Sequence, residues 1–381
     1  ALNESLTFEH HNDDWDFYRG PEPDERGELI LKGSIAQYRR GYVHRSNHQG
    51  TGYSKTFRYD DRLQHIAPPG LEGRERFVIE GRYDELRLEP QDEPYQIRNA
   101  EINSLIVEPG VDIELIGHQP IVIQDKLTML GTSEEPIIIR PDMIGERALF
   151  RVERGIYSRI ELNHVRFESN ITTQIACDSL IVNNCQFNGA VNWEGTIEVT
   201  NSTFSETATM TGWNRLAVSH SVFEGGLVIA GNTSDGHLIN NTFVKSSDSG
   251  LRLRRFRQLE IMNNTIAFNE KGIENSHHLV PELSYNNVYG NEDGDYYYCI
   301  AGEGSISSDP LFVDIRSDDY RVTADSPCID AGNPNSAPDP DGTRADIGAF
   351  HFPQLGFDFI NHNDNNPKET KKLFTNRCFT N

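Results

Sequence analysis

A short pattern of apolar and polar residues recurs between residues 148 and 291. Each copy has a β-prone pair, one or two Asn or His residues, a small or β-branched residue and then a large apolar residue. The copies end at Phe167, Phe187, Phe204, Phe223, Phe243, Ile266 and Val288, in steps of 20, 17, 19, 20, 23 and 22 residues. A period of about 20 residues with strand-forming residue types predicts stacked coils, each too small to bury its own apolar face. We expect the five phenylalanines to stack as an aromatic column in the core.

A second pattern, between residues 105 and 140, precedes these copies. Ile and Val residues surround the turn Pro109-Gly110, and Gly131-Thr132 comes shortly before Pro136. Gly and Pro-Gly mark the places where strands bend from one sheet to the next, and the apolar pairs fill the stacked interior. This segment resembles the opening coils of right-handed parallel β-helix repeat proteins, in which a V-x-P-G-V turn leads into GT-x-x-x-PI. The resemblance implies an all-β chain that forms a right-handed parallel β-helix (a solenoid).

In that family, the Asn of such a repeated phrase often stacks at a turn and forms an amide ladder. The resemblance therefore implies a structural role for the Asn residues of the pattern, which are Asn184, Asn201, Asn241 and Asn264. His164 and His220 occupy the corresponding place in their copies, so we expect them to be turn residues and not ligands.

The repeats are expected to stop after Asn291, where a different series of motifs begins. In order, these are DPLFVD at 309–314, SPCIDAG at 326–332 and DxDGTRxDIGAF at 339–350. The series resembles the C-terminal closing segment of secreted bacterial β-helix proteins, often found just ahead of a surface-anchoring or sorting domain. Such a segment would cover the open end of the solenoid, whose unpaired strand edges otherwise invite aggregation.

The N-terminal part contains a run that predicts a strand around Glu28–Ile35 and a distinctive block that ends at Pro68-Pro69. Its string Gly-Tyr-Ser-Lys-x-Phe-x-Tyr-Asp-x-Arg-Leu, at 52–63, resembles a block near the C-termini of large bacterial surface proteins that carry prepilin-like N-termini. The resemblance implies the distal part of a longer exported or appendage-associated protein. The predicted organisation is an N-terminal β-rich segment (1–71), coils (72–291), the closing segment (292–352) and a tail or linker (353–381).

Charge and composition narrow the choice of partners. The chain of 381 residues has 35 basic and 58 acidic residues, a net charge of −23. This balance argues against nucleic acid, because phosphate binding needs a basic face. It is compatible with divalent cations, with a cationic partner, with solubility outside a cell or simply with a solvated acidic surface. No apolar run reaches membrane-spanning length, and no signal peptide is visible.

The five cysteines form no CxxC pair, which argues against a zinc or redox motif. Cys177 and Cys185 flank one turn of the repeat and could form a bridge, and Cys299 and Cys328 could staple the C-terminal region. Buried free thiols are an equally good interpretation. The odd count leaves at least one thiol unpaired within the chain.

Arg252 and Arg254 are the weak catalytic candidates. They alternate with Leu251 and Leu253, so both should point outward from one strand. Polysaccharide lyases on this fold use an exposed basic residue to abstract a proton next to a uronate carboxylate. No lysine companion or clear Asp cluster is evident on neighbouring coils, so a solvated or salt-bridged surface is the alternative.

Other polar groups suggest metal or acid–base chemistry. Asp339, Asp341 and Asp346 alternate around a glycine, as calcium sites do, although Asp339 and Asp341 could simply cap turns and Arg344 could pair with Asp346. The pair His277-His278 lies beside Glu274 and Asn275 and is a weak metal signal. Paired carboxylates on adjacent coils would indicate a glycosidase, and the sequence does not place its candidates, Asp178, Asp235 and Asp248, on one face.

Two functions therefore remain in view. The first is a non-catalytic bacterial extracellular or cell-surface protein with a structural, adhesive or appendage-assembly role, which binds a polysaccharide or another surface protein or self-associates through its coil ends. The second is a carbohydrate-active enzyme, either a polysaccharide lyase or a glycoside hydrolase, on the same fold. A fold alone does not choose between them.

Overall fold

The structure of this chain is a computed structural model, which describes residues 78–117, 120–141, 148–153, 158–168 and 171–354 and three strands nearer the N-terminus. Those strands are β1 (Thr7–His11), β2 (Trp15–Arg19) and β3 (Tyr42–His44), and they form an antiparallel sheet in the order β2-β1-β3. The predicted strand around Glu28–Ile35 and the string at 52–63 lie outside the described residues.

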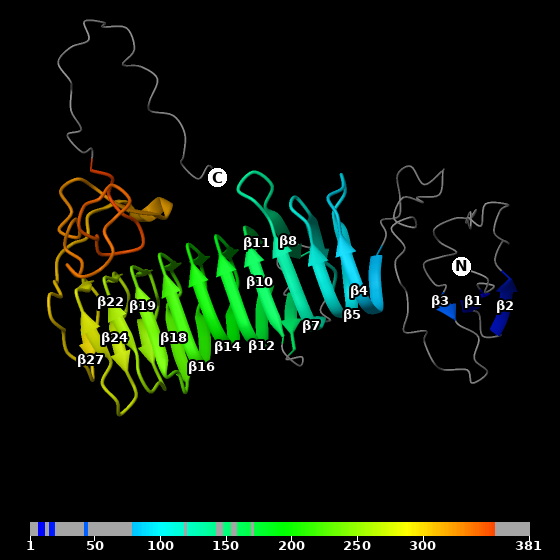
Figure 1. The fold of residues 1–381 in the computed structure, drawn as a ribbon, viewed down its shortest axis with the longest axis horizontal. Helices are drawn as coiled ribbons and strands as arrows, with labels where there is room; N and C mark the ends of the chain where they lie inside the picture. Colours follow the sequence, from blue (N-terminus) through cyan, green and yellow to red (C-terminus); the bar gives the residue numbers. More distant parts are fainter. Residues whose placement is uncertain are drawn as a thin grey trace, which may run out of the picture.

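The main body is a parallel β-solenoid, which confirms the predicted all-β fold class (Figure 1). Each coil passes through three sheets in turn. The long strands bend at corners. β4 (Val78–Leu88) and β5 (Tyr95–Val107) contribute to all three sheets. Four others contribute to two sheets each: β7 (Ile121–Leu130), β12 (Ile171–Asn183), β14 (Val191–Thr200) and β16 (Ala208–Ser219). Register shifts or changes of partner mark these bends.

The other strands each belong to one sheet. The first sheet contains β6 (Asp112–Leu115), β8 (Ile137–Pro141), β11 (Val165–Phe167), β13 (Gln186–Phe187), β15 (Thr203–Phe204), β17 (Val222–Phe223), β20 (Thr242–Val244), β23 (Thr265–Ala267) and β26 (Asn287–Tyr289). The second contains β9 (Ala148–Val152), β18 (Leu227–Gly231), β21 (Ser249–Leu253), β24 (Lys271–Asn275) and β27 (Gly294–Tyr297). The third contains β10 (Arg159–Asn163), β19 (Asp235–Ile239), β22 (Glu260–Met262) and β25 (Glu282–Ser284).

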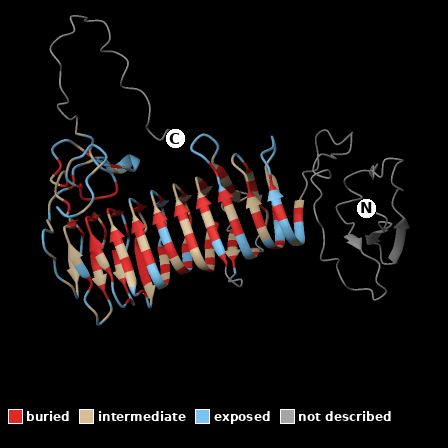
Figure 2. Ribbon diagram, viewed as in Figure 1, coloured by how far each residue is buried: buried red, intermediate tan, exposed pale blue. Residues whose placement is uncertain are grey.

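The predicted aromatic column is confirmed in the interior of the coils. Buried residues follow the inward positions of the strands from one coil to the next (Figure 2). Ring centroids of the successive phenylalanines from Phe167 to Phe243 lie 5.1, 5.2, 4.6 and 5.1 Å apart, with interplanar angles of 14° or less. All five rings are fully buried. Because the strands pair in parallel and in register, one side-chain position stacks on itself in every coil.

The corner between the third and first sheets is made by residues with positive φ. The corner residues are His164, Asn184, Asn201, His220, Asn240, Asn263 and Tyr285, with φ between 48° and 57°. Asn and His tolerate this left-handed conformation better than most residues. The turn role of His164 and His220 is therefore confirmed, as it is for Asn184 and Asn201.

Asn241 and Asn264 form the predicted amide ladder, but they lie one residue after the corner. Their copies carry two consecutive asparagines, and the first of each pair, Asn240 or Asn263, takes the positive φ. The second residue then points inward and is fully buried. A shift by one residue moves a side chain from outside to inside, because side chains alternate along a strand.

The inward residue after each corner forms a hydrogen-bonded ladder along the solenoid. Each side-chain oxygen accepts a bond from the backbone N–H of the equivalent residue in the preceding coil. The ladder runs through Cys185, Ser202, Ser221, Asn241, Asn264, Asn286 and Ser305, with N···O distances of 2.9–3.2 Å. A shorter ladder of Ser246, Asn269 and Asn291 occupies the corner between the first and second sheets. These bonds satisfy buried backbone donors and hold the coils in register.

The closing segment packs along the side of the last coils. It contains β28 (Phe312–Asp314), the single-turn 3-10 helix η1 (Ile315–Ser317) and β29 (Asp319–Val322). Asn240 Nδ2 donates to the Asp346 carbonyl at 2.7 Å, and Gly348 N donates to the Asn263 carbonyl at 2.9 Å. These contacts are lateral, whereas the start of the segment, at Gly294–Tyr297, stacks on the last coil.

Sheet pairing continues beyond Asn291. Strand β27 stacks on β24, and the bridges Ser284–Glu303 and Asn287–Ile306 then add part of one more coil. Among the described residues, no helix is long and apolar enough to cross a membrane.

The four described cysteines, Cys177, Cys185, Cys299 and Cys328, are free thiols, so neither proposed bridge is formed. Cys185 lies on the internal ladder, whereas Cys328 belongs to the closing segment and accepts a bond from Asn287 Nδ2 at 3.2 Å.

Candidate functional site

Arg252 is held in an ion-pair cluster on the second sheet. Its strand, β21, pairs with β24, which places Arg252 directly beside Glu274. Arg252 Nη2 and Nε lie 2.9 and 3.1 Å from Glu274 Oε2, and Nη2 also pairs with Asp248. Ser249 Oγ donates to the same Glu274 oxygen at 2.7 Å. The salt-bridged alternative is therefore confirmed for Arg252, and Glu274 is its partner on the adjacent coil.

The electrostatics of this cluster keep both groups charged. Burial by itself lowers the pKa of Arg252, but hydrogen bonds and charge from Glu274 and Asp248 outweigh it and raise the pKa. Burial raises the pKa of Glu274, yet the bonds from Ser249 and Arg252 prevail and lower it. A guanidinium stabilised in this way is a poor base for proton abstraction from a sugar carbon. Arg254 lies just beyond the end of β21 and is exposed.

A second cluster, which the sequence did not reveal, lies on the third sheet around His237. Its Nδ1 is 2.9 Å from Glu260 Oε2 and its Nε2 is 2.7 Å from Asp235 Oδ1. Arg215 Nη1 pairs with the other Asp235 oxygen at 2.9 Å. The strand register places His237, Glu260 and Glu282 at one outward position of three successive coils.

This cluster can hold or move a proton. Burial lowers the pKa of His237, but the bonds to Glu260 and Asp235 outweigh it and raise the pKa above the ordinary value. The hydrogen bond from His237 is the largest of the effects that lower the pKa of Asp235. The side chain of His237 is 35% exposed. A solute in water could therefore reach the ring.

The three scattered aspartates do not come together as one carboxylate pair. Asp235 lies on the third sheet, Asp248 precedes strand β21 of the second sheet, and Asp178 lies at the bend of β12. Each of them has its own partners on its own face. The acidic residues that do come close to each other are Asp235 and Glu260, because both contact His237.

The predicted calcium residues are used as turn formers. Asp346 is buried, and its two oxygens accept from the Asp330 and Phe352 amides at 2.7 and 2.6 Å. Asp339 accepts from the Asp346 amide at 2.9 Å. Hydrogen bonds from the Gln354 amide and from Thr343 lower the pKa of Asp341 to about 2.

In the part of the chain that the structure describes, no group of three His, Cys, Asp or Glu side chains is arranged to hold a metal ion. Calcium binding by Asp339, Asp341 and Asp346 stays a prediction, which a thermal melt with added calcium or chelator would test.

The pair His277-His278 packs on the turn that contains Phe256. The ring centroids of His277 and Phe256 lie 5.1 Å apart, and the two histidine rings lie 4.2 Å apart. His277 Nδ1 accepts from the Leu279 amide at 3.4 Å, which engages that nitrogen within the turn. The pair thus forms part of a packed turn surface.

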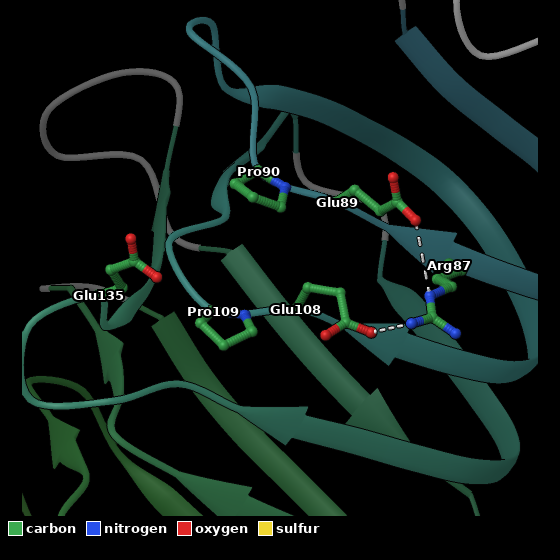
Figure 3. A pocket seen from close by; sticks show the side chains of 6 residues that line it. All are labelled: Arg87, Glu89, Pro90, Glu108, Pro109 and Glu135. Carbon is green, nitrogen blue, oxygen red and sulfur yellow. Dashed lines mark ion pairs between the residues drawn. The ribbon is translucent and has the colours of Figure 1, made fainter.

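A shallow depression of about 380 Å³ lies among the first coils (Figure 3). It is lined by Arg87, Glu89, Pro90, Glu108, Pro109 and Glu135. Arg87 pairs with Glu108 at 2.6 Å and lies 3.8 Å from Glu89. Glu89-Pro90 and Glu108-Pro109 follow strands of the third sheet, and Glu135 shortly precedes a strand of the first sheet. These turns therefore lie at the same corner of successive coils. The depression is acidic and open, and no nucleophile lines it.

Comparisons of the chain with protein-family models and with curated proteins give no match. The functional argument therefore rests on the geometry of these clusters.

Proposed function

We propose that this chain is a non-catalytic scaffold that acts outside the bacterial cell or at its surface, in a structural, adhesive or appendage-assembly role. The extracellular setting rests on the resemblance of the closing segment and of the N-terminal block to secreted and surface proteins. The scaffold role rests on how the polar residues of the coils are used.

One observation carries the proposal: the inward polar side chains form continuous ladders that fix the stacking of coils. Ser202, Ser221, Asn241, Asn264 and Asn286 each bond to the backbone of a neighbouring coil. The aromatic column runs beside this ladder. Such a body resists bending and presents its turns at fixed spacing, which suits a surface that binds and spaces partners.

The test measures turnover and shape on the same preparation. The full chain is incubated with pectin, alginate and glycosaminoglycans while absorbance from unsaturated products is followed. Small-angle scattering then reports whether the particle is elongated. We expect an elongated particle and no absorbance change, and robust turnover of any of these polymers would overturn the non-catalytic role.

The alternative is a carbohydrate-active enzyme, a lyase or a hydrolase, and the cluster around His237 is the observation that favours it. A histidine between two carboxylates could act as a general acid or base. If turnover is found, His237→Ala should lower it by at least tenfold, whereas the exposed Arg98→Ala on the first coils should leave it unchanged.

A further inference from the structure

A turn between the second and third sheets carries three arginines in succession around one buried ring. The residues are Arg254, Arg255 and Arg257, and Phe256 between them is 2% exposed. Backbone bonds fix the turn: Arg254 N donates to the Ile229 carbonyl at 2.9 Å and Arg257 N donates to the Thr233 carbonyl at 2.8 Å. The three guanidinium groups therefore stand on a rigid base and are exposed to solvent.

None of these three arginines forms an ion pair with a described residue. Three carboxylates of the neighbouring strands are engaged by other groups. Glu274 and Asp248 bind Arg252 on one side of the turn, and Asp235 binds Arg215 and His237 on the other. In a chain of net charge −23, a group of unpaired arginines is a local exception.

Exposed planar rings continue this surface over the next two coils. His278 is exposed and lies against His277, which packs on Phe256. In the following coil Tyr298 is 85% exposed, and its carbonyl accepts a bond from Asn275, which also bonds the Leu279 carbonyl of the histidine turn. An exposed aromatic ring offers an apolar face that a ligand can cover.

We propose that the turn surface formed by Arg254, Arg255, Arg257, His278 and Tyr298 binds an anionic polysaccharide. This rests on the proposed function and names its partner and its site.

Each arginine can bind a carboxylate or sulfate through two parallel hydrogen bonds, and this forked geometry is the strongest that a guanidinium makes. Sugar rings can pack on the exposed tyrosine and histidine. Successive coils lie about 4.8 Å apart, so one polymer that lies along the solenoid can contact several turns at once and gain avidity. An acidic peptide could bind the arginines but would not pack on the exposed rings. A nucleic acid would be repelled by the strongly acidic protein around this turn surface.

Affinity electrophoresis of the full chain tests the proposal, in gels that contain polygalacturonate, heparin, neutral dextran or poly-glutamate. We expect retardation by polygalacturonate or heparin. Retardation by heparin alone would indicate that sulfate is required, because polygalacturonate carries only carboxylates. The variant R254A/R255A/R257A should weaken binding at least tenfold, and Tyr298→Ala should weaken it about threefold without a change in charge. Binding should also weaken as salt is raised, since the contacts are ionic.

The matched control is R82A/R87A/R98A, which removes the same charge from arginines that are ion-paired on the first coils. It should change binding less than twofold. Equal loss in the control, equal retardation by dextran, or tighter binding of poly-glutamate than of either polysaccharide would overturn the proposal. If the triple alanine variant does not fold, R254K/R255K/R257K keeps the charge and should still weaken binding severalfold.

The outcome is separable from that of the proposed function. Absence of both binding and turnover overturns this site and leaves the scaffold role standing. Turnover of a bound polymer overturns the non-catalytic role and leaves the binding surface in place.

Discussion

The first coils and the last coils of the solenoid differ in their interiors, although both carry ion pairs on the outer surface. In the first coils the interior is aliphatic, and polar side chains pair across the outer surface, as in Arg98–Glu80 at 2.5 Å and Arg140–Asp112 at 3.1 Å. In the last coils buried asparagines such as Asn264 and Asn269 carry the contacts from coil to coil. Solvent screens the outer pairs but not the inner ones. Ion pairs that depend on salt should therefore contribute to the stability of the first coils, whereas buried hydrogen bonds should contribute to that of the last coils.

The largest effect should come from cutting the column that joins the two regions. Phe204 stacks on Phe187 and Phe223 at 5.2 and 4.6 Å. Phe204→Ala leaves a cavity and should cost about 3–5 kcal/mol. In a repeat protein a weakened interface lowers cooperativity, so hydrogen exchange should show the first and last coils opening separately. A single cooperative transition with an unchanged midpoint would contradict this.

Breaking the inner ladder should have the next largest effect, confined to the last coils. Asn264 Oδ1 accepts from the Asn241 amide at 2.9 Å, so Asn264→Ala leaves that buried N–H without a partner. We expect a loss of about 2–3 kcal/mol in urea unfolding. The control is Asn201→Gly, because glycine adopts the positive φ of that corner freely and should change stability by less than about 1 kcal/mol. Equal losses in both variants would show that the ladder adds nothing.

Removing an outer pair of the first coils should have a smaller effect that depends on salt. Arg98→Ala breaks the exposed pair with Glu80 and should cost about 0.2–1 kcal/mol at low ionic strength. In molar salt the difference from the parent chain should vanish, whereas that of Asn264→Ala should persist. Thermal melts at two salt concentrations measure the stability of both variants. A loss of stability in Arg98→Ala that does not change with salt would contradict this difference between the two regions.

The smallest effect concerns pH and the outer cluster of the last coils. The pKa of His237 is raised in the folded chain, so its contribution is fully present below the ordinary histidine pKa and is lost as pH rises through the folded value. His237→Gln should therefore destabilise the chain at pH 6 by at most about 1 kcal/mol and have no effect in alkaline solution. Melting temperatures of the two proteins should converge as pH rises, and a constant gap would refute the assignment.

The interior of the coils was predictable because its spacing is regular. Steps of about 20 residues placed every phenylalanine of the column correctly, since inward positions repeat once per coil. The doubled asparagines could not be assigned in the same way, because the sequence does not say which member takes the positive φ. Asn240 and Asn263 do so, and the ladder residues Asn241 and Asn264 follow one residue after the corner.

The candidate site was less predictable because it depends on the outward register. Arg252 and Glu274, like His237 and Glu260, are neighbours only through pairing of strands on successive coils. Turn lengths vary between coils, and a change of one residue in a turn moves such a partner to the other side of the strand. The step of 22 or 23 residues in the last repeats was the available signal for both pairs.

The lateral closing segment has a consequence for the order in which the chain folds. Coil contacts join residues about one repeat apart, whereas Tyr320 bonds Glu224 and Asn240 bonds Asp346 across 96 and 106 residues. Long loops close late, because their ends must find each other against chain entropy. The coils must fold before the closing segment can dock on them, so this segment should fold last. Once docked, it should slow the local unfolding of the coils that it contacts.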